Sequence, residues 1–142
     1  MKRFVKCVFS IILCAVSVGT GCAETVIDLD LSQVNRNITY AQMLQVLSAP
    51  ADHAGKIFRL KGRFNYAESK DLARIIFSDS TGCCEVAVQF IPSGSLRYPE
   101  DYPPLYGEFL ITARLEMAPD GAETACRFVD AVIEWGEEGA GK

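Results

Sequence analysis

The sequence predicts an all-β fold with a small helical part: a five-stranded barrel with one short N-terminal helix, preceded by a signal peptide. Three observations predict it. A basic and then apolar stretch occupies the first 22 residues, one short segment has helical spacing, and five later segments alternate apolar and polar residues. The 142 residues leave room for one domain of about a hundred residues after the leader.

Residues 1–22 are typical of a secretion leader. Three of the first six residues are basic, and a largely apolar run extends from Phe4 to Val18. The run is shorter than the roughly 20 apolar residues that span a bilayer. Small residues precede Cys22, which favours a lipoprotein leader whose cleavage makes an acylated Cys22 the new N-terminus. Cleavage after Ala23 by an ordinary signal peptidase is the alternative.

The leader sets both the expected location and the charge of the mature chain. We expect an exported, membrane-anchored lipoprotein of the cell envelope or, without the lipid, a periplasmic or secreted protein. All 18 acidic residues lie beyond the leader, which removes three of the 14 basic ones, so the mature chain has a net charge of −7. Nucleic-acid affinity depends on neutralising phosphates, so no nucleic-acid partner is expected. The expected partners are the membrane, through the lipid anchor, and an envelope protein or transporter.

The mature chain divides into three parts. In residues 23–38 apolar and polar residues alternate only partially, and we expect this segment to be a tether or an edge strand. Residues 39–136 are the predicted barrel domain. The remaining residues, 137–142, are expected to be a disordered tail.

A short helix is predicted at the start of the domain. Thr39 and Gln42 form a Thr-x-x-Gln capping box, and Pro50 ends the helix. Helical spacing places four apolar residues on one face, which we expect to pack against the barrel: Tyr40, Met43, Leu44 and Leu47.

Five segments with period-two alternation are the predicted strands: Ile57–Phe64, Leu72–Phe77, Cys83–Ile91, Glu108–Met117 and Glu123–Trp135. In the first strand Gly62 lies on the inward face, where it suits a bend that closes a barrel. In the last, the alternation slips near Val129, as a β-bulge would produce. Two strong hairpins and a long connection between the third and fourth strands are typical of an OB-like barrel, with a small open sandwich as the alternative.

Three cysteines remain in the folded domain, Cys83, Cys84 and Cys126. The alternation places Cys84 and Cys126 on the inward faces of the third and fifth strands, which are neighbours in an OB barrel. The first prediction is therefore a Cys84–Cys126 disulfide with Cys83 unpaired. Three free or redox-sensing thiols are one alternative.

The second alternative is a thiolate metal site that uses Cys83, Cys84 and Cys126 together. Three thiolates suit zinc or copper, which are the cofactors to be considered for this chain. A fourth ligand could come from His53, Asp79 or Glu85. Adjacent strand residues point to opposite faces, so both neighbouring cysteines can face one ion only if the strand starts with a turn, which Gly82 permits.

A tyrosine-rich loop and a basic row are further candidates for binding. Tyr98, Glu100, Asp101 and Tyr102 could recognise a cation or a peptide; the alternative is that the tyrosines pack over an open end of the barrel, stiffened by the prolines between them. The row Arg59, Lys61 and Arg63 lies where OB barrels often bind ligands. Because the mature chain is acidic, we expect a solvated face balanced by neighbouring acids.

Several motifs together resemble those of small uncharacterised bacterial lipoproteins with an OB-like domain. They are a D-x-T-x-C-C stretch within Phe77–Phe90, a Y-P-x-D-Y-P loop at Tyr98–Pro103, a third cysteine at Cys126 and an opening strand at Gly55–Gly62. A more distant similarity is to the Cys-Cys-bearing OB-like domain that accompanies a class of bacterial membrane permeases. The resemblance implies the fold and the lipoprotein location, and it implies no activity.

The sequence offers no catalytic constellation. His53, the single histidine, lies 30 residues from Cys83, and no motif links them. We therefore expect a non-enzymatic, exported, membrane-tethered OB-like binding or accessory module of the cell envelope, linked to metal handling. The alternative is a thiol-redox or thiolate metal-binding protein that uses Cys83, Cys84 and Cys126.

Overall fold

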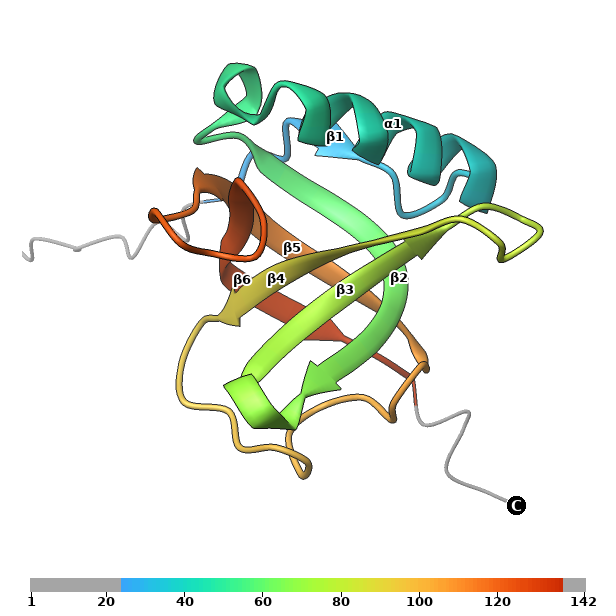
Figure 1. The fold of residues 1–142 in the computed structure, drawn as a ribbon. Helices are drawn as coiled ribbons and strands as arrows, with labels where there is room; N and C mark the ends of the chain where they lie inside the picture. The colour runs from blue at the N-terminus through green and yellow to red at the C-terminus, as the bar shows by residue number, and fades with distance from the viewer. Residues whose placement is uncertain (1–23, 137–142) are drawn as a thin grey trace, which may run out of the picture.

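A computed structural model describes residues 24–136 of the chain (Figure 1). The predicted leader with Cys22 and the predicted tail at residues 137–142 lie outside the described residues. Within them, no helix is both long and apolar enough to span a membrane. The elements in chain order are β1 (Leu29–Asp30), α1 (Arg36–Ser48), β2 (Ile57–Ala67), β3 (Leu72–Ser78), β4 (Glu85–Pro92), β5 (Glu108–Met117) and β6 (Cys126–Glu134), with short 3-10 turns at Pro50–His53 and Glu68–Lys70.

Five of the strands form a closed barrel. They are hydrogen-bonded in the order β2-β3-β4-β6-β5, and β5 pairs with β2 to complete the ring. The pair β4–β6 is parallel and the other pairs of the ring are antiparallel. The short β1 lies beside β2 as a parallel edge strand. This order confirms the predicted OB-like barrel and excludes the open sandwich.

The barrel is filled by the inward residues of its strands and closed at both ends. Helix α1 lies across one end, and the connection between β4 and β5 crosses the other (Figure 1). Alternate inward residues are buried because successive side chains of a strand point to opposite faces. The largest fully buried side chains are Met43, Val46, Phe58, Leu60, Phe64, Ile75, Val88, Phe90, Ile111, Leu115, Cys126 and Phe128.

Strand β2 bends at Gly62, as the sequence predicts. Residues 57–63 of β2 pair with β5, whereas residues 63–67 pair with β3, so one strand serves two neighbours that diverge. A Cβ at Gly62 would lie 2.5 Å from Cγ1 of Ile75 and 2.9 Å from the backbone oxygen of Ile76. The close approach of β3 therefore requires a glycine at this position.

Helix α1 begins earlier than the capping box predicts. Asn35 is the N-cap, and its side chain accepts a hydrogen bond from the backbone N–H of Ile38 at 3.0 Å. Asparagine is among the strongest N-cap residues, so it defines the start in place of Thr39. Thr39 is instead buried inside the helix, where its hydroxyl donates to the Asn35 carbonyl at 3.3 Å.

The packed face of α1 also differs in one position from the predicted face. Met43 is fully buried and Tyr40 and Leu47 are partly buried against the core, as expected. Leu44 is exposed, and Val46 is buried in its place. The helix lies across the barrel end at an angle that the helical spacing alone does not define.

Two details of the strands test the sequence predictions. The predicted bulge in β6 is confirmed: the register with β5 shifts between Thr112 and Arg114, opposite Asp130, which has a φ of 52°. Strand β4 begins at Glu85 and not at Cys83, so the prediction that Cys84 faces the barrel interior is wrong. Both adjacent cysteines lie in the turn that precedes the strand.

Candidate functional site

The connection between β3 and β4, residues 79–84, is a tight turn organised by Asp79. The Asp79 N–H donates to the Cys84 carbonyl at 3.2 Å, which closes the turn. The Asp79 carboxylate accepts from the Gly82 N–H at 2.7 Å and from the Thr81 hydroxyl at 2.8 Å. Gly82 has a φ of +72°, which a glycine adopts at little cost. These bonds hold the carboxylate over the residues that follow it.

The turn brings two thiols and one carboxylate together. The Sγ atoms of Cys83 and Cys84 lie 3.7 Å apart, and Cys83 Sγ lies 3.6 Å from Asp79 Oδ2. One ligand atom from each of the three residues lies within 4.8 Å of the others. Both cysteines are exposed to solvent. Because they precede the strand, they avoid the opposite orientation that a strand would impose on neighbours.

The electrostatics of the turn favour an ionised Asp79 carboxylate beside a protonated Cys84 thiol. The Thr81 hydroxyl, with help from backbone N–H groups, lowers the pKa of Asp79 below its ordinary value. The hydrogen bond and the charge of Cys83 raise the pKa of the Cys84 thiol, and the nearby Asp79 carboxylate adds to this. Two adjacent thiolates and a carboxylate repel one another. A cation that replaced the thiol protons would relieve this repulsion.

Helix α1 supports the turn from the side. The Asn37 side-chain oxygen accepts a hydrogen bond from the Ser80 N–H at 2.7 Å. Tyr40 lies beside the cysteines: desolvation raises its pKa, and negative charge on Cys84, Asp79 and Cys83 raises it further. The first turns of α1 thus fix the site to the end of the barrel (Figure 1).

The predicted Cys84–Cys126 disulfide is not formed; the three cysteines that the structure describes are free. Cys126 is fully buried at the start of β6. In the parallel pair β4–β6, Phe90 is opposite Phe128, so Cys126 is level with Val88, whereas Cys84 lies four residues earlier in the chain, just before β4 begins. Four strand residues span about 13 Å, whereas a disulfide requires Cα atoms within about 7 Å. Cys126 is for the same reason separated from the other two cysteines.

Of the three residues considered as an additional metal ligand, Asp79 alone joins the cysteines. His53 lies in the 3-10 turn beyond the C-terminal end of α1 and packs against Phe58, with ring centroids 6.4 Å apart. The cysteines lie beside the opposite end of that helix. Glu85 follows Cys84 but forms an ion pair with Arg63.

The tyrosine-rich loop closes the barrel end opposite α1. Tyr98 stacks on Tyr66 with ring centroids 3.8 Å apart, and Tyr102 stacks on Phe64 at 5.3 Å. Asp101 accepts a hydrogen bond from the Arg97 N–H at 2.9 Å. Glu100 is exposed. The structure therefore uses the two rings for packing and does not gather them with the two acids around one ligand position.

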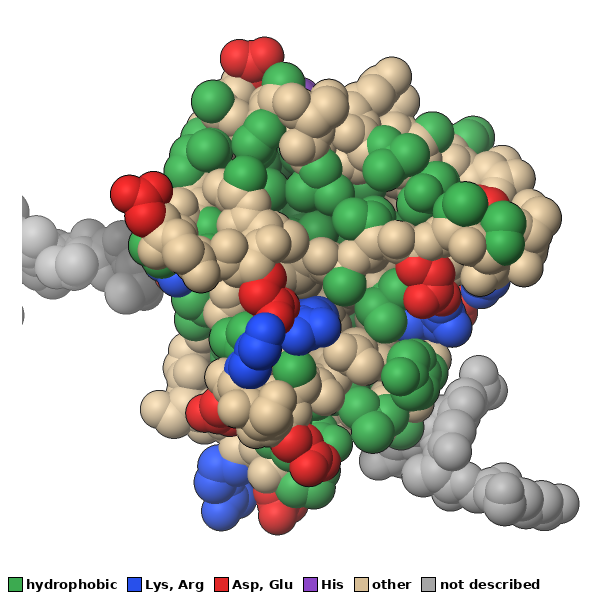
Figure 2. Space-filling model, viewed as in Figure 1, with side chains coloured by type: hydrophobic (Ala, Val, Ile, Leu, Met, Phe, Trp, Pro, Cys, Tyr) green, Lys and Arg blue, Asp and Glu red, His purple; other side chains and the backbone are tan. Residues whose placement is uncertain are grey.

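The basic row of β2 lies on the barrel surface and is matched by acids, as expected. Acidic and basic side chains lie next to one another on the visible face (Figure 2). The ion pairs of the row are Arg59–Glu134, Lys61–Glu108 and Arg63–Glu85.

No protein-family model matches the chain, and no curated protein matches it. Of the features that the resemblance implies, the structure shows a small five-stranded β-barrel domain with a cluster of one aspartate and two cysteines. The comparisons identify no family. The sequence contained a signal for this cluster, since Asp79 and the two cysteines belong to one D-x-T-x-C-C stretch.

Proposed function

We propose that this protein is an exported OB-like binding module that holds a thiophilic metal ion, zinc or copper(I), with Cys83, Cys84 and Asp79. The observation that carries the proposal is the presence of three ligand atoms within 4.8 Å of one another in a single turn. Thiolates are the preferred protein ligands of both metals, and carboxylate oxygen is a common third ligand of zinc.

The spacing of the ligand atoms fits a tetrahedral ion. Zinc–sulfur bonds of about 2.3 Å and zinc–oxygen bonds of about 2.0 Å place two sulfurs about 3.8 Å apart and a sulfur and an oxygen about 3.5 Å apart. The corresponding distances in the turn are 3.7 Å between the two sulfurs and 3.6 Å between Cys83 Sγ and Asp79 Oδ2. An ion could enter this turn with little rearrangement of the chain.

The site favours exchange of the ion over permanent storage. Structural zinc sites are closed by four protein ligands, whereas sites with three ligands keep one position open for water or another molecule. Here three ligands come from one exposed turn, so a donor or acceptor protein could reach the ion. After cleavage of the leader, an acylated Cys22 would hold the module at the membrane, where an envelope protein or transporter would exchange metal with it.

Metal titration of the mature chain tests the proposal. The reduced protein, freed of reductant without air, is titrated with Zn²⁺ and with Cu⁺ against a coloured competing chelator. We expect one equivalent of metal, an affinity lowered about a hundredfold in Cys83→Ser and Cys84→Ser, and a loss of about tenfold in Asp79→Asn.

Cys126→Ala is the matched control because it removes a thiol outside the turn. Its metal affinity should equal that of the wild type, even if the protein melts at a lower temperature. The proposal fails if the variant lacking both Cys83 and Cys84 binds either metal as tightly as the wild type, or if Cys126→Ala loses the same affinity.

A thiol-redox role is the second candidate, because the same 3.7 Å separation would allow Cys83 and Cys84 to form a disulfide with each other. Geometry argues against it, since consecutive Cα atoms lie about 3.8 Å apart, closer than the roughly 4.4–6.8 Å that disulfides usually span, so a Cys83–Cys84 bridge would be strained. Treatment with oxidised glutathione distinguishes the roles. A redox protein would release two glutathione molecules and lose two hydrogens between Cys83 and Cys84 by peptide mass.

A further inference from the structure

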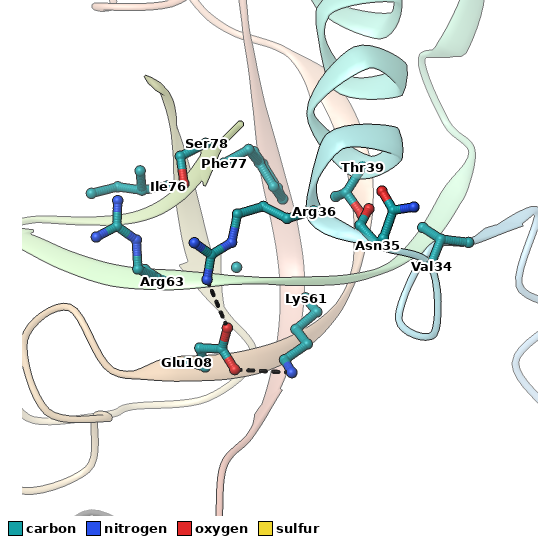
Figure 3. A pocket seen from close by; sticks show the side chains of 11 residues that line it. Val34, Asn35, Arg36, Thr39, Lys61, Arg63, Ile76, Phe77, Ser78 and Glu108 are labelled. Atoms are coloured by element: carbon teal, nitrogen blue, oxygen red, sulfur yellow. Dashed lines mark hydrogen bonds and ion pairs between the residues drawn. The ribbon is translucent and has the colours of Figure 1, made fainter. Parts of the chain in front are cut away.

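A second candidate site lies in a cavity of about 280 Å³ beside the first turn of α1. The cavity lies over β2 and β3 and is bounded by the start of β5 (Figure 3). None of Asp79, Cys83 and Cys84 lines it. Its walls combine apolar surface from Val34 and Ile76 with four charged side chains.

Positive charge predominates in this cavity. Three of the charged side chains are the cations Arg36, Lys61 and Arg63, and the fourth is Glu108. Arg36 and Lys61 both point toward Glu108, at 3.4 Å and 2.9 Å, while the Arg63 guanidinium points away from it (Figure 3). The hydrogen bond from Lys61 lowers the pKa of Glu108, and Arg36 lowers it further, so Glu108 is a carboxylate already bound by cations.

One hydrogen-bond donor of the Arg63 side chain has no acceptor within residues 24–136. The Arg63 guanidinium forms an ion pair with Glu85. Its Nε is buried and has no hydrogen-bond acceptor among the residues that the structure describes. Because Nε is closed off from solvent, an anion in the cavity would bind Arg63 through the terminal nitrogens of the guanidinium, of which Nη2 already holds Glu85.

We propose that the cavity binds a small organic oxyanion, a carboxylate or a phosphate ester. The oxyanion accepts hydrogen bonds from Arg36 and Arg63, whose planar guanidinium groups suit such ligands, and it competes with Glu108 for the cations. The organic part contacts Val34 and Ile76. Small-molecule pockets usually range from about 300 to 1,000 Å³, so a cavity of 280 Å³ restricts the ligand to a small one.

Titration calorimetry with citrate and with phenyl phosphate tests the proposal and distinguishes the two anion classes. It uses the full mature chain carrying Cys83→Ser and Cys84→Ser, at constant ionic strength, so that neither anion can bind through a metal ion. The outcome is therefore independent of the proposed metal function. We expect saturable binding of at least one anion, weakened about tenfold by Arg36→Gln and by Arg63→Gln.

Glu108→Gln is predicted to act in the opposite direction. It removes a competing negative charge and frees Arg36 and Lys61, so the anion should bind about tenfold more tightly. A variant that merely unfolds could not produce this gain. Arg97→Gln is the matched control, since the Arg97 side chain is 80% exposed and does not line the cavity; it should leave the affinity unchanged.

The proposal is overturned by any of three results: no saturable binding of citrate or phenyl phosphate, weaker binding in Glu108→Gln, or a loss in Arg97→Gln as large as that in Arg36→Gln. The last result would mean that the anion responds only to the net charge of the protein.

Discussion

Substitution of Gly62 by alanine is predicted to destabilise the barrel where β2 bends. The new Cβ would lie 2.5 Å and 2.9 Å from Cγ1 and Cδ1 of Ile75, and 2.9 Å from the backbone oxygen of Ile76. Ile75 is fully buried, so its side chain has little room to move away. The Ile76 oxygen can retreat only if β3 moves away from β2.

The expected loss follows from these contacts. Overpacking a core usually costs about 1–3 kcal/mol, and a collision with backbone places Gly62→Ala at the upper end. The reduced freedom of the unfolded chain offsets about 0.5 kcal/mol. We expect unfolding to become easier by about 2.5 kcal/mol, which lowers the melting temperature of a domain of this size by about 10–15 °C. Urea denaturation followed by circular dichroism measures the first quantity and a thermal melt the second.

Two further variants test the cause. Gly94→Ala is the control, because its Cβ would meet nothing within 4 Å and only its φ of +88° is unfavourable; it should cost about 1 kcal/mol. Combining Gly62→Ala with Ile75→Ala should cost less than the sum of the two single changes, since the smaller side chain removes part of the collision. A change of less than about 0.5 kcal/mol in Gly62→Ala would refute the tight closure of β2 on β3.

Three other predictions concern titratable groups. Under native conditions iodoacetamide should modify Cys83 and Cys84 but not Cys126, which is buried and whose pKa is raised by that burial. Mass spectrometry of a mature chain that begins after Cys22 should find two labels without denaturant and three with it; a single label without denaturant would contradict the free thiols. Metal affinity should rise with pH, because the pKa of the Cys84 thiol is raised and the ion must displace the thiol proton. Competition titrations between about pH 6 and 8 should show an affinity gain of about tenfold per pH unit for each proton released. An affinity that does not change with pH would contradict thiolate ligation. The hydrogen bond to Asp71 is the largest cause that raises the pKa of Tyr66 to about 12. Ultraviolet titration should therefore show Tyr66 ionising at a lower pH in Asp71→Asn than in the wild type, and an unchanged titration would refute that hydrogen bond.

The barrel could be predicted because each of its strands has a recognisable pattern of apolar and polar residues that are close together in the sequence. Alternation of apolar and polar residues defined the strands to within a few residues, and the inward position of Gly62 indicated the bend in β2. The slipped alternation near Val129 indicated the bulge in β6. Each of these signals depends on residues that are close in the sequence.

The errors came from relations that local patterns do not contain. Asn35 and Thr39 are both suitable N-caps, and the choice between them depends on how α1 packs over the barrel. The disulfide prediction assumed that neighbouring strands place Cys84 and Cys126 at the same level, but the register of a parallel pair is defined by the whole fold. The candidate site was found only in part, because the turn at Gly82 decides which way Cys83 and Cys84 point.

The confinement of the cysteine turn to six consecutive residues has a consequence for folding. Ligands that are neighbours along the chain remain neighbours when the barrel unfolds, so a denatured chain would retain much of its attraction for the ion. Ligand binding stabilises a fold only to the extent that the native state binds more tightly than the denatured one. Binding of the proposed metal ion to the turn should therefore change the melting temperature little. The barrel would keep its shape both before and after the ion is released.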